Sequence, residues 1–259
     1  MSGYVLEEVL EISSVEENGS FLKITTTYSS KSSQYSKKLL RISLFDEAQP
    51  DPFGYALVSN KTHHKLDLNV TVDSELDVAQ LELKIKSGSK ISISEVEVPS
   101  KLNFSSLGKG KRLFFFASEL SGLLALQLLD DYMFYCNFDE IIFIHSISNT
   151  FKQAYQYPVK KVFNRLAREL APAGFSVSYL SIVCPSNVDI NCHLSRFLYQ
   201  NKFYSEQGIV QLNHIHDKAV VLGNRIMVEN ISEELGFLGF LSILDAPEQA
   251  DYLEWIVEK

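Results

Sequence analysis

Two histidines near the end of the chain have the type and spacing that could bind a metal. His214 and His216 are two residues apart, so on a strand their side chains would lie on one face. Asp217 would then point to the opposite face, and no distant cysteine or histidine has the spacing that completes a metal site. We therefore expect no metal and interpret both histidines as residues at the start of a strand. His145 lies inside the apolar run IIFIHSIS, and we expect a core histidine bonded to backbone.

A turn in the middle of the chain has the position, but not the composition, of a phosphate-binding loop. Residues 117–121, Ala-Ser-Glu-Leu-Ser, follow a buried apolar run and precede a helical pattern. A phosphate needs glycines that let the backbone approach it and free amides at the start of the helix. We expect instead that Ser118 caps the helix and that Glu119 lies in its first turn, so that the protein's own side chains satisfy this helix.

The composition excludes several classes of protein. The chain has 259 residues, of which 46% are apolar, and its formal net charge of -8 argues against general nucleic-acid binding. Its three cysteines form no Cys-x-x-Cys pair and are odd in number, so we expect neither zinc nor disulfides, and a reducing compartment. The start does not resemble a signal peptide, and the longest apolar segments are too short to span a membrane. These features predict a cytoplasmic protein.

The elements that would position these residues change in kind near residue 108. Before it, β-branched runs with a period of two alternate with short polar turns, which predicts an antiparallel β-barrel or β-sandwich domain over residues 1–108. A helical pattern over residues 74–89 interrupts these strands. After it, continuous apolar strands alternate with helical patterns, which predicts an α/β domain with a parallel sheet over residues 109–259. The helices are expected over residues 118–132, 149–170, 192–201 and 228–238.

Four segments occur in an order typical of one family: GKRLFFFA, FDEIIFIHSI, VVLGNRIMVENISEELGFLGF and the terminal YLEWIVEK. With the preceding β domain, they make the chain resemble the bacterial ferredoxin/flavodoxin–NADP(+) reductase family from Tyr4 to Lys259. The resemblance implies a flavin-binding barrel followed by a nucleotide-binding α/β domain. It also implies electron transfer between NADPH, FAD and a small electron carrier.

The resemblance implies where a flavin would bind, and the expected arginine is missing there. The family's Arg-x-Tyr-Ser run corresponds to FGYALVSN, residues 53–60, which contains no arginine. A shift of one residue brings Tyr55 into the aromatic position. If a flavin binds, the resemblance therefore implies a shifted site with Tyr55, Ser59 and Asn60, and Trp255 stacked on the ring.

The resemblance also implies a nucleotide site, and its phosphate-binding glycines are replaced. Their places in the turn are taken by Glu119 and Ser121. A Gly-Asn pair that the family carries at the end of a strand persists as Gly223 and Asn224. If NADP(H) binds, Ser118, Gly223 and Asn224 are the residues expected to contact it.

Two hypotheses follow for the function. We favour a non-catalytic relative of these reductases, without a cofactor, that binds a protein partner or a small ligand in the crevice between its domains. The alternative is an active, divergent FAD-dependent NAD(P)H oxidoreductase that passes electrons to ferredoxin or flavodoxin. In that case Arg41, Lys61 or Lys65 would have to supply the missing positive charge.

Overall fold

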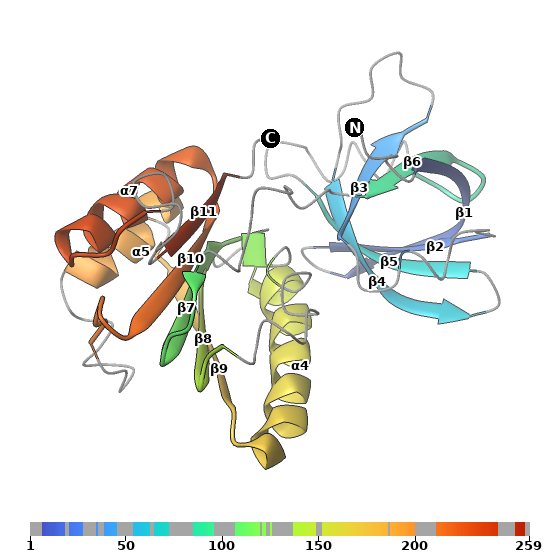
Figure 1. The fold of residues 1–259 in the computed structure, drawn as a ribbon. Coiled ribbons are helices and arrows are strands. Elements are labelled where there is room, and N and C mark those ends of the chain that lie inside the picture. The colour runs from blue at the N-terminus through green and yellow to red at the C-terminus, as the bar shows by residue number, and fades with distance from the viewer. Residues whose placement is uncertain are drawn as a thin grey trace, which may run out of the picture. The chain divides into compact units, whose positions relative to one another are not determined.

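The structure is a computed structural model, and it places most of the strands and helices of both halves of the chain (Figure 1). The described residues are 7–18, 21–27, 35, 39–45, 54–62, 65–72, 85–95, 107–119, 121, 122, 125, 137–148, 152–185, 187–199, 211–242 and 252–256. The chain divides into two compact units, Met1–Glu97 and Val98–Lys259, which are described separately below. The domain boundary that the sequence suggests, between residues 108 and 109, stays a prediction.

The first unit is a closed six-stranded antiparallel barrel. Alternate residues of its strands point inward, so apolar side chains such as Leu40, Ile42, Ala56 and Ile93 form one core inside it. The strand order around the barrel is β1-β2-β5-β4-β3-β6, and β6 pairs with β1 to close it. This confirms the predicted barrel. Its strands are β1 (Glu7–Asn18), β2 (Phe21–Thr26), β3 (Leu39–Leu44), β4 (Gly54–Thr62), β5 (Lys65–Val72) and β6 (Lys90–Glu95).

The second unit contains a five-stranded parallel sheet. Its strand order is β11-β10-β7-β8-β9, and each neighbouring pair is parallel. The apolar runs predicted these strands because side chains on both faces of such a sheet are buried. All seven residues of β7, for example, are buried. The strands are β7 (Arg112–Ser118), β8 (Glu140–Ser148), β9 (Ser176–Cys184), β10 (Asp217–Gly223) and β11 (Tyr252–Ile256).

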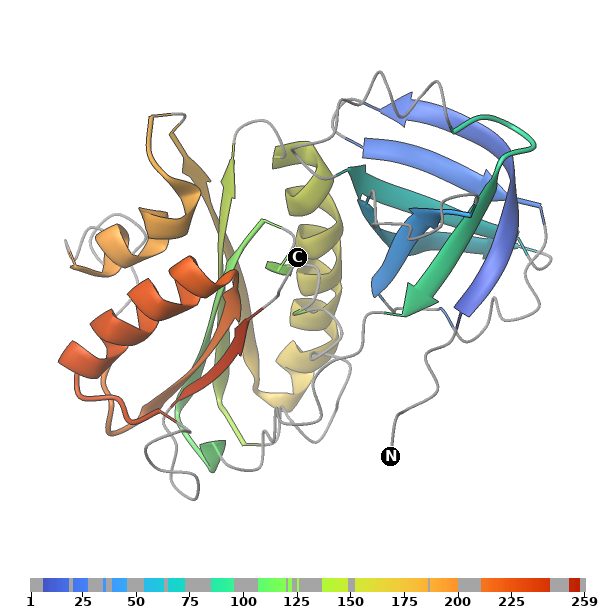
Figure 2. The same ribbon diagram turned by 90° about the horizontal axis from the view of Figure 1, so that it is seen from above.

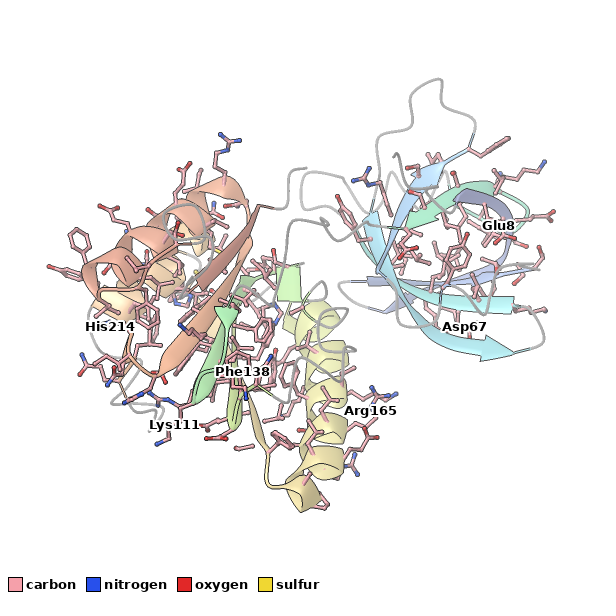
Figure 3. All side chains as sticks on the ribbon, viewed as in Figure 1. Glu8, Asp67, Lys111, Phe138, Arg165 and His214 are labelled. Atoms are coloured by element: carbon pink, nitrogen blue, oxygen red, sulfur yellow. The ribbon has the colours of Figure 1, made fainter. Side chains whose placement is uncertain are left out.

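Helices cover both faces of this sheet. Helix α4 (Lys152–Leu170), followed by the short η2 (Ala171–Ala173), lies on one face against β8 and β9. Helices α5 (Ile190–Tyr199) and α7 (Arg225–Phe237) lie on the other face (Figure 2). On α4, Arg165 points away from the sheet into solvent (Figure 3). The three helices confirm the predicted helical patterns within two or three residues at most ends. Of the pattern over residues 118–132, the structure describes 118 and 119, which end β7 and form a turn, and 121, 122 and 125, which are helical. The pattern over 74–89 lies largely outside the described residues.

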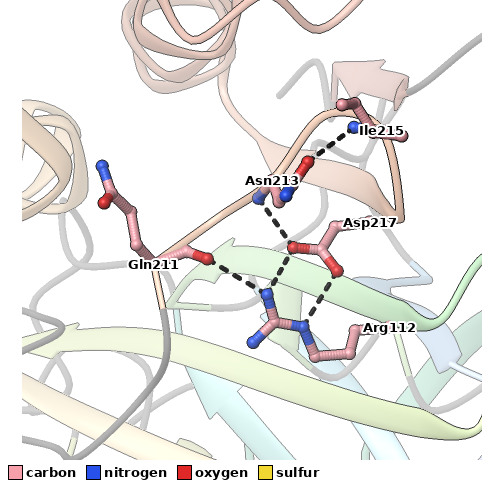
Figure 4. Close-up of polar contacts among 5 residues, drawn as sticks. All are labelled: Arg112, Gln211, Asn213, Ile215 and Asp217. Carbon is pink, nitrogen blue, oxygen red and sulfur yellow. Dashed lines mark hydrogen bonds and ion pairs between the residues drawn. The ribbon is translucent and has the colours of Figure 1, made fainter.

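An ion pair holds the amino ends of β7 and β10 together. The guanidinium of Arg112 donates from Nε to Oδ1 of Asp217 at 2.9 Å and from an Nη to Oδ2 at 2.5 Å (Figure 4). The same carboxylate accepts the backbone amide of Asn213, and the guanidinium also donates to the carbonyl of Gln211. Asp217, which the sequence suggested only as an unsuitable metal ligand, is therefore a structural residue.

Among the described helices, none combines the length and the apolar composition that crossing a bilayer requires.

Candidate functional site

The strand order defines the edge of the sheet where a ligand would bind. The chain runs from β7 outward to β8 and β9, and then returns to the other side of β7 for β10 and β11. In open parallel sheets, ligands bind beyond the carboxyl ends of the strands at the point where the order reverses. Here that point lies between the ends of β7 and β10, beside Ser118 and Gly223.

Glu119 directly follows Ser118 at this edge of the sheet, and its contacts hold it on the side of β8. Its backbone has φ 45°, a left-handed conformation that glycine adopts easily and glutamate rarely does. Its amide donates to the carbonyl of Ser146 at 2.9 Å, and its Oε1 accepts the backbone amide of Ser148 at 2.8 Å. The turn thus has a backbone conformation suited to glycine. At the same time, the carboxylate of Glu119 accepts a hydrogen bond from the backbone amide at the end of the neighbouring strand β8.

The expectation that Ser118 caps the helix is wrong. Ser118 is the last residue of β7, pairs with Ser146 of β8 and is only 5% exposed. The strand continues one residue further than the sequence suggests, and the first described helical residue is Ser121. Glu119 therefore lies in the turn before the helix, where its side chain reaches across to β8 rather than along the helix axis.

Burial makes the charge of this carboxylate costly. Desolvation raises the pKa of Glu119, and hydrogen bonding to the side chain and backbone of Ser148 opposes the rise. Only the backbone bond has good geometry, and Oε2 is buried without a hydrogen-bond partner. The pKa of the Cys184 thiol is raised as well, chiefly by burial and then by the negative charges of Glu119 and Asp189. A buried thiol with a raised pKa is a poor nucleophile, in agreement with the absence of a nucleophile motif in the sequence.

His145 connects the turn to the core beneath it. It is fully buried, its Nε2 lies 2.7 Å from the carbonyl oxygen of Glu119, and its Nδ1 lies 3.1 Å from the hydroxyl of Tyr179. Because a carbonyl can only accept, Nε2 carries the proton and Nδ1 accepts from Tyr179. Burial lowers the pKa of His145 to about 4, so the ring is neutral at neutral pH. The predicted core histidine bonded to backbone is confirmed.

The helix after the turn lies directly on this histidine. A Cβ atom on Gly122 would collide with the imidazole ring of His145. The glycine in this position therefore serves close packing between helix and strand. Gly122 and His145 together keep the carbonyl of Glu119 in place.

The Gly-Asn pair at the end of β10, Gly223 and Asn224, has a structural role in this chain. Asn224 is the N-cap of α7, and its Oδ1 accepts the amide of Met227 at 2.9 Å, while its Nδ2 donates to Oδ1 of Asn191 on α5. A Cβ on Gly223 would collide with the sulfur of Met227. Helix capping and close packing are thus sufficient reasons for these residue types.

The structure also shows a buried polar pair that sequence reasoning missed. Ser146 of β8 lies with its Oγ 2.7 Å from Nδ1 of His193 on α5, and both side chains are buried. Burial, and then Arg196, lower the pKa of His193. No spacing in the sequence relates Ser146 to His193, because they are 47 residues apart on different elements.

On the barrel, the candidate flavin residues lie on β4, and a cation lies beside them. Arg41 of β3 is paired in register with Tyr55 of β4 and, on its other side, with Ser94 of β6. Their neighbours Leu40, Ile42, Ala56 and Ile93 form the barrel core, so these three side chains point outward. Tyr55 is 9% exposed and Arg41 is exposed.

Several other candidate residues are described only in part. Ser59 and Asn60 belong to β4, and the register with β5 shifts between Val58 and Asn60. Trp255 belongs to β11, opposite Leu222 of β10. The structure does not describe the side chains of these three candidates, and Cys136 lies outside the described residues.

The histidines near β10 lie in the exposed turn that precedes this strand, residues 214–216 (Figure 3). The ring of His214 stands edge-on to that of Phe240, at 6.4 Å between centroids. Within the described part of the chain, no three side chains of histidine, cysteine, aspartate or glutamate are grouped so that they could hold a metal ion.

An antiparallel barrel followed by a parallel sheet of order 3-2-1-4-5 is the two-domain fold of ferredoxin reductases, and this chain has it. The chain is similar to a ferredoxin NADP+ reductase from Neisseria gonorrhoeae with bound FAD and NADP, with 15% identity and a TM-score of 0.62 over 96% of this chain and 98% of that one. A ferredoxin-NADP+ reductase from Plasmodium falciparum matches with 9% identity and a TM-score of 0.55, over 99% and 98% of the two chains. A flavohemoglobin from Malassezia yamatoensis with bound FAD and heme matches with 9% identity and a TM-score of 0.56, over 98% of this chain and 60% of that one.

No protein-family model and no curated protein sequence matches the chain. The likeness is therefore one of fold, and it agrees with the fold that the sequence resemblance implies.

Proposed function

We propose that this protein is a non-catalytic relative of the ferredoxin reductases, which uses their fold to bind a protein partner or a small ligand. The observation that carries this proposal is the carboxylate of Glu119, which lies at the carboxyl edge of the sheet, beyond β7, and is bonded to the end of β8. A dinucleotide phosphate placed there would meet a negative charge, and the amide of Ser148 is already bonded. The residues present do not fit NADP(H).

The retained motif residues do not argue against this proposal. Gly223 and Asn224 are explained by Met227 and by the cap of α7, without any ligand. Ser118 is buried within a strand. We therefore keep these three residues as contacts of a nucleotide only for the alternative function below.

Purified protein tests the proposal directly. We expect a colourless protein that does not oxidise NADPH or NADH, with or without added FAD and an artificial electron acceptor. Isothermal titration with NADP+ should show no binding at millimolar ligand. A yellow protein that reduces the acceptor at the expense of NADPH would overturn the proposal.

A second function, a flavin-dependent oxidoreductase, is favoured by one observation on the barrel. Arg41, Tyr55 and Ser94 stand in one row across three neighbouring strands and point outward. They supply a cation, an aromatic ring and a hydroxyl, the groups that a flavin nucleotide would use for its phosphate, its ring and its polar edge. Trp255, Ser59 and Asn60 stay candidates for the same site.

Quenching of flavin fluorescence distinguishes this second function from the first. If the barrel binds FAD, titration of the protein into FAD should quench its emission, and Arg41→Ala should weaken binding by about tenfold or more through loss of a charge-assisted bond. Lys86→Ala, which removes an exposed cation that is not among the candidate flavin residues, serves as the control. No quenching by the wild-type protein would dispose of the flavin function.

The partner and the location are part of the proposal and rest on the sequence. The net charge of -8 disfavours nucleic acid as the partner, and the cysteine pattern favours the cytoplasm.

A further inference from the structure

The turn after β7 combines two features that are hard to reconcile in an ordinary loop. Its backbone at Glu119 has a left-handed φ of 45°, which costs free energy for any residue except glycine and, to a lesser degree, asparagine and aspartate. Its side chain is a buried carboxylate with one oxygen that lacks a hydrogen-bond partner. A residue without strain or buried charge, such as glycine, would be expected on stability grounds alone.

The contacts of Glu119 show what this unfavourable residue does. Its amide is bound by the carbonyl of Ser146, and its carbonyl by the ring of His145, so the backbone is fixed at both ends. The carboxylate then reaches the amide of Ser148, the last residue of β8. A backbone amide at the carboxyl edge of a parallel sheet, beside the start of a helix, is the kind of donor that binds phosphate. In this chain its acceptor is a side chain.

We propose that Glu119 is an internal ligand: its carboxylate occupies an otherwise preserved anion site and keeps phosphate-containing ligands out. This inference rests on the proposed function and explains how the site was closed, namely by one side chain on a backbone whose shape still suits glycine. Removing that side chain frees the amide of Ser148 and relieves the strain at φ 45°. The opened site takes a phosphate or pyrophosphate group.

The test compares two variants of the full chain, Glu119→Gly and Glu119→Gln, with pyrophosphate as the probe. Glycine removes the carboxylate and fits the left-handed backbone. Glutamine removes the charge but keeps an oxygen that can accept the amide of Ser148. We expect pyrophosphate to bind to Glu119→Gly at least about tenfold more tightly than to the wild type, because a charge-assisted bond becomes available. We expect Glu119→Gln to resemble the wild type.

The amide resonance of Ser148 in a 1H–15N correlation spectrum gives a readout at the site itself. In Glu119→Gly it should move upfield as the bond to the carboxylate is lost, and pyrophosphate should move it again. If glycine prevents folding, Glu119→Asn replaces it, since asparagine tolerates the left-handed backbone and is too short to reach Ser148. The same resonance shifts are then expected.

Three outcomes contradict the inference or its basis in separate ways. A Ser148 resonance that does not respond to pyrophosphate in the folded glycine or asparagine variant overturns the internal ligand. Equal gains of affinity in Glu119→Gly and Glu119→Gln also overturn it, because charge repulsion alone would then explain the exclusion. Tight binding of NADP+ to the wild type would instead refute the proposed function.

Discussion

At the scale of single residues, the carboxyl edge of the sheet is built from buried polar groups that bind one another. His145 connects the hydroxyl of Tyr179 to the carbonyl of Glu119, and Ser146 is bonded to His193 on the opposite face. Each group would be costly to bury alone, and each has a partner from another element. These pairs hold the turn after β7 in place, so the shape of the site depends on them.

The buried state of His145 makes the stability of the protein depend on pH. Its pKa falls from 6.5 in the unfolded chain to about 4 in the folded protein, so below pH 6.5 the unfolded state binds the proton more readily. The contribution of the neutral His145 ring to the free energy of unfolding is complete above pH 6.5. It decreases as the pH falls toward 4, by about 3 kcal/mol in total. Urea unfolding across this range should show a smaller pH dependence for His145→Gln than for the wild type.

An exposed histidine provides the control for this experiment. His216→Gln replaces an exposed histidine in the turn before β10 and is measured beside His145→Gln. A wild-type free energy of unfolding that stays constant between pH 6.5 and 4 would contradict the assignment of His145 as a buried neutral ring.

The ion pair between Arg112 and Asp217 leads to a second prediction. Asp217→Ala leaves a guanidinium that is about nine-tenths buried without its carboxylate, and we expect a loss of about 3–5 kcal/mol in the free energy of unfolding. The double variant Arg112→Met/Asp217→Leu should lose less, since it removes the uncompensated charge. Denaturant titration of both variants measures the difference.

A surface ion pair on α4 is the comparison. Arg165 and Glu169 are 3.9 Å apart and exposed, so Arg165→Ala should change stability by less than about 1 kcal/mol. If Asp217→Ala costs no more than Arg165→Ala, the buried pair has no structural importance.

At the scale of elements, α7 is connected to its surroundings through its first residues. Asn224 caps the helix and bonds to Asn191 on α5, while Met227 lies against Gly223 at the end of β10. Asn230 of α7 also donates to the carbonyl of Asn191. Helices α5 and α7 are thus joined by side-chain amides at the same edge of the sheet.

Replacing the cap tests whether Asn224 is structural. Asn224→Ala should lower the free energy of unfolding by about 1 kcal/mol or somewhat more, because it removes the cap and the bond to Asn191. Asn224→Ser retains an oxygen for the cap and should lose less. Equal stability of Asn224→Ala and the wild type would show that the cap is not needed, and a ligand role for Asn224 would then regain weight.

At the scale of the whole molecule, the described apolar side chains form separate cores. One lies inside the barrel, and another lies between the sheet and helices α5 and α7. The two units share one chain, yet the described residues of the barrel core all lie between residues 10 and 93. Each core can therefore be disturbed by itself.

A cavity in the barrel should weaken only the barrel. Ile42 is fully buried there, and Ile42→Ala is expected to cost about 2–5 kcal/mol. Hydrogen exchange should then quicken in β3 and β4, while the amides of β7 and β8 keep their protection. Faster exchange in both units would show that they unfold as one cooperative body.

Much of this architecture could be predicted from local patterns. The period of two before residue 108 indicated an antiparallel barrel or sandwich, and the apolar runs after it indicated the parallel sheet, because strand periodicity is a property of adjacent residues. The resemblance to the reductase family favoured the barrel. The absence of phosphate-binding glycines from the turn after β7 could also be predicted, because it is read directly from the adjacent residues 117–121. The role of Ser118 was predicted wrongly, since the end of a strand is set by pairing with its neighbour.

The sequence by itself thus determined the kind of each element and the replacement of glycine by Glu119. Only the tertiary structure decided what the replacement does. The carboxylate of Glu119 bonds to an amide 29 residues away, and Asn224 bonds to an asparagine 33 residues away. Such contacts depend on the order in which parallel strands assemble, and no spacing in the sequence records that order. The same holds for Arg41, which lies opposite Tyr55 because β3 and β4 pair in that register.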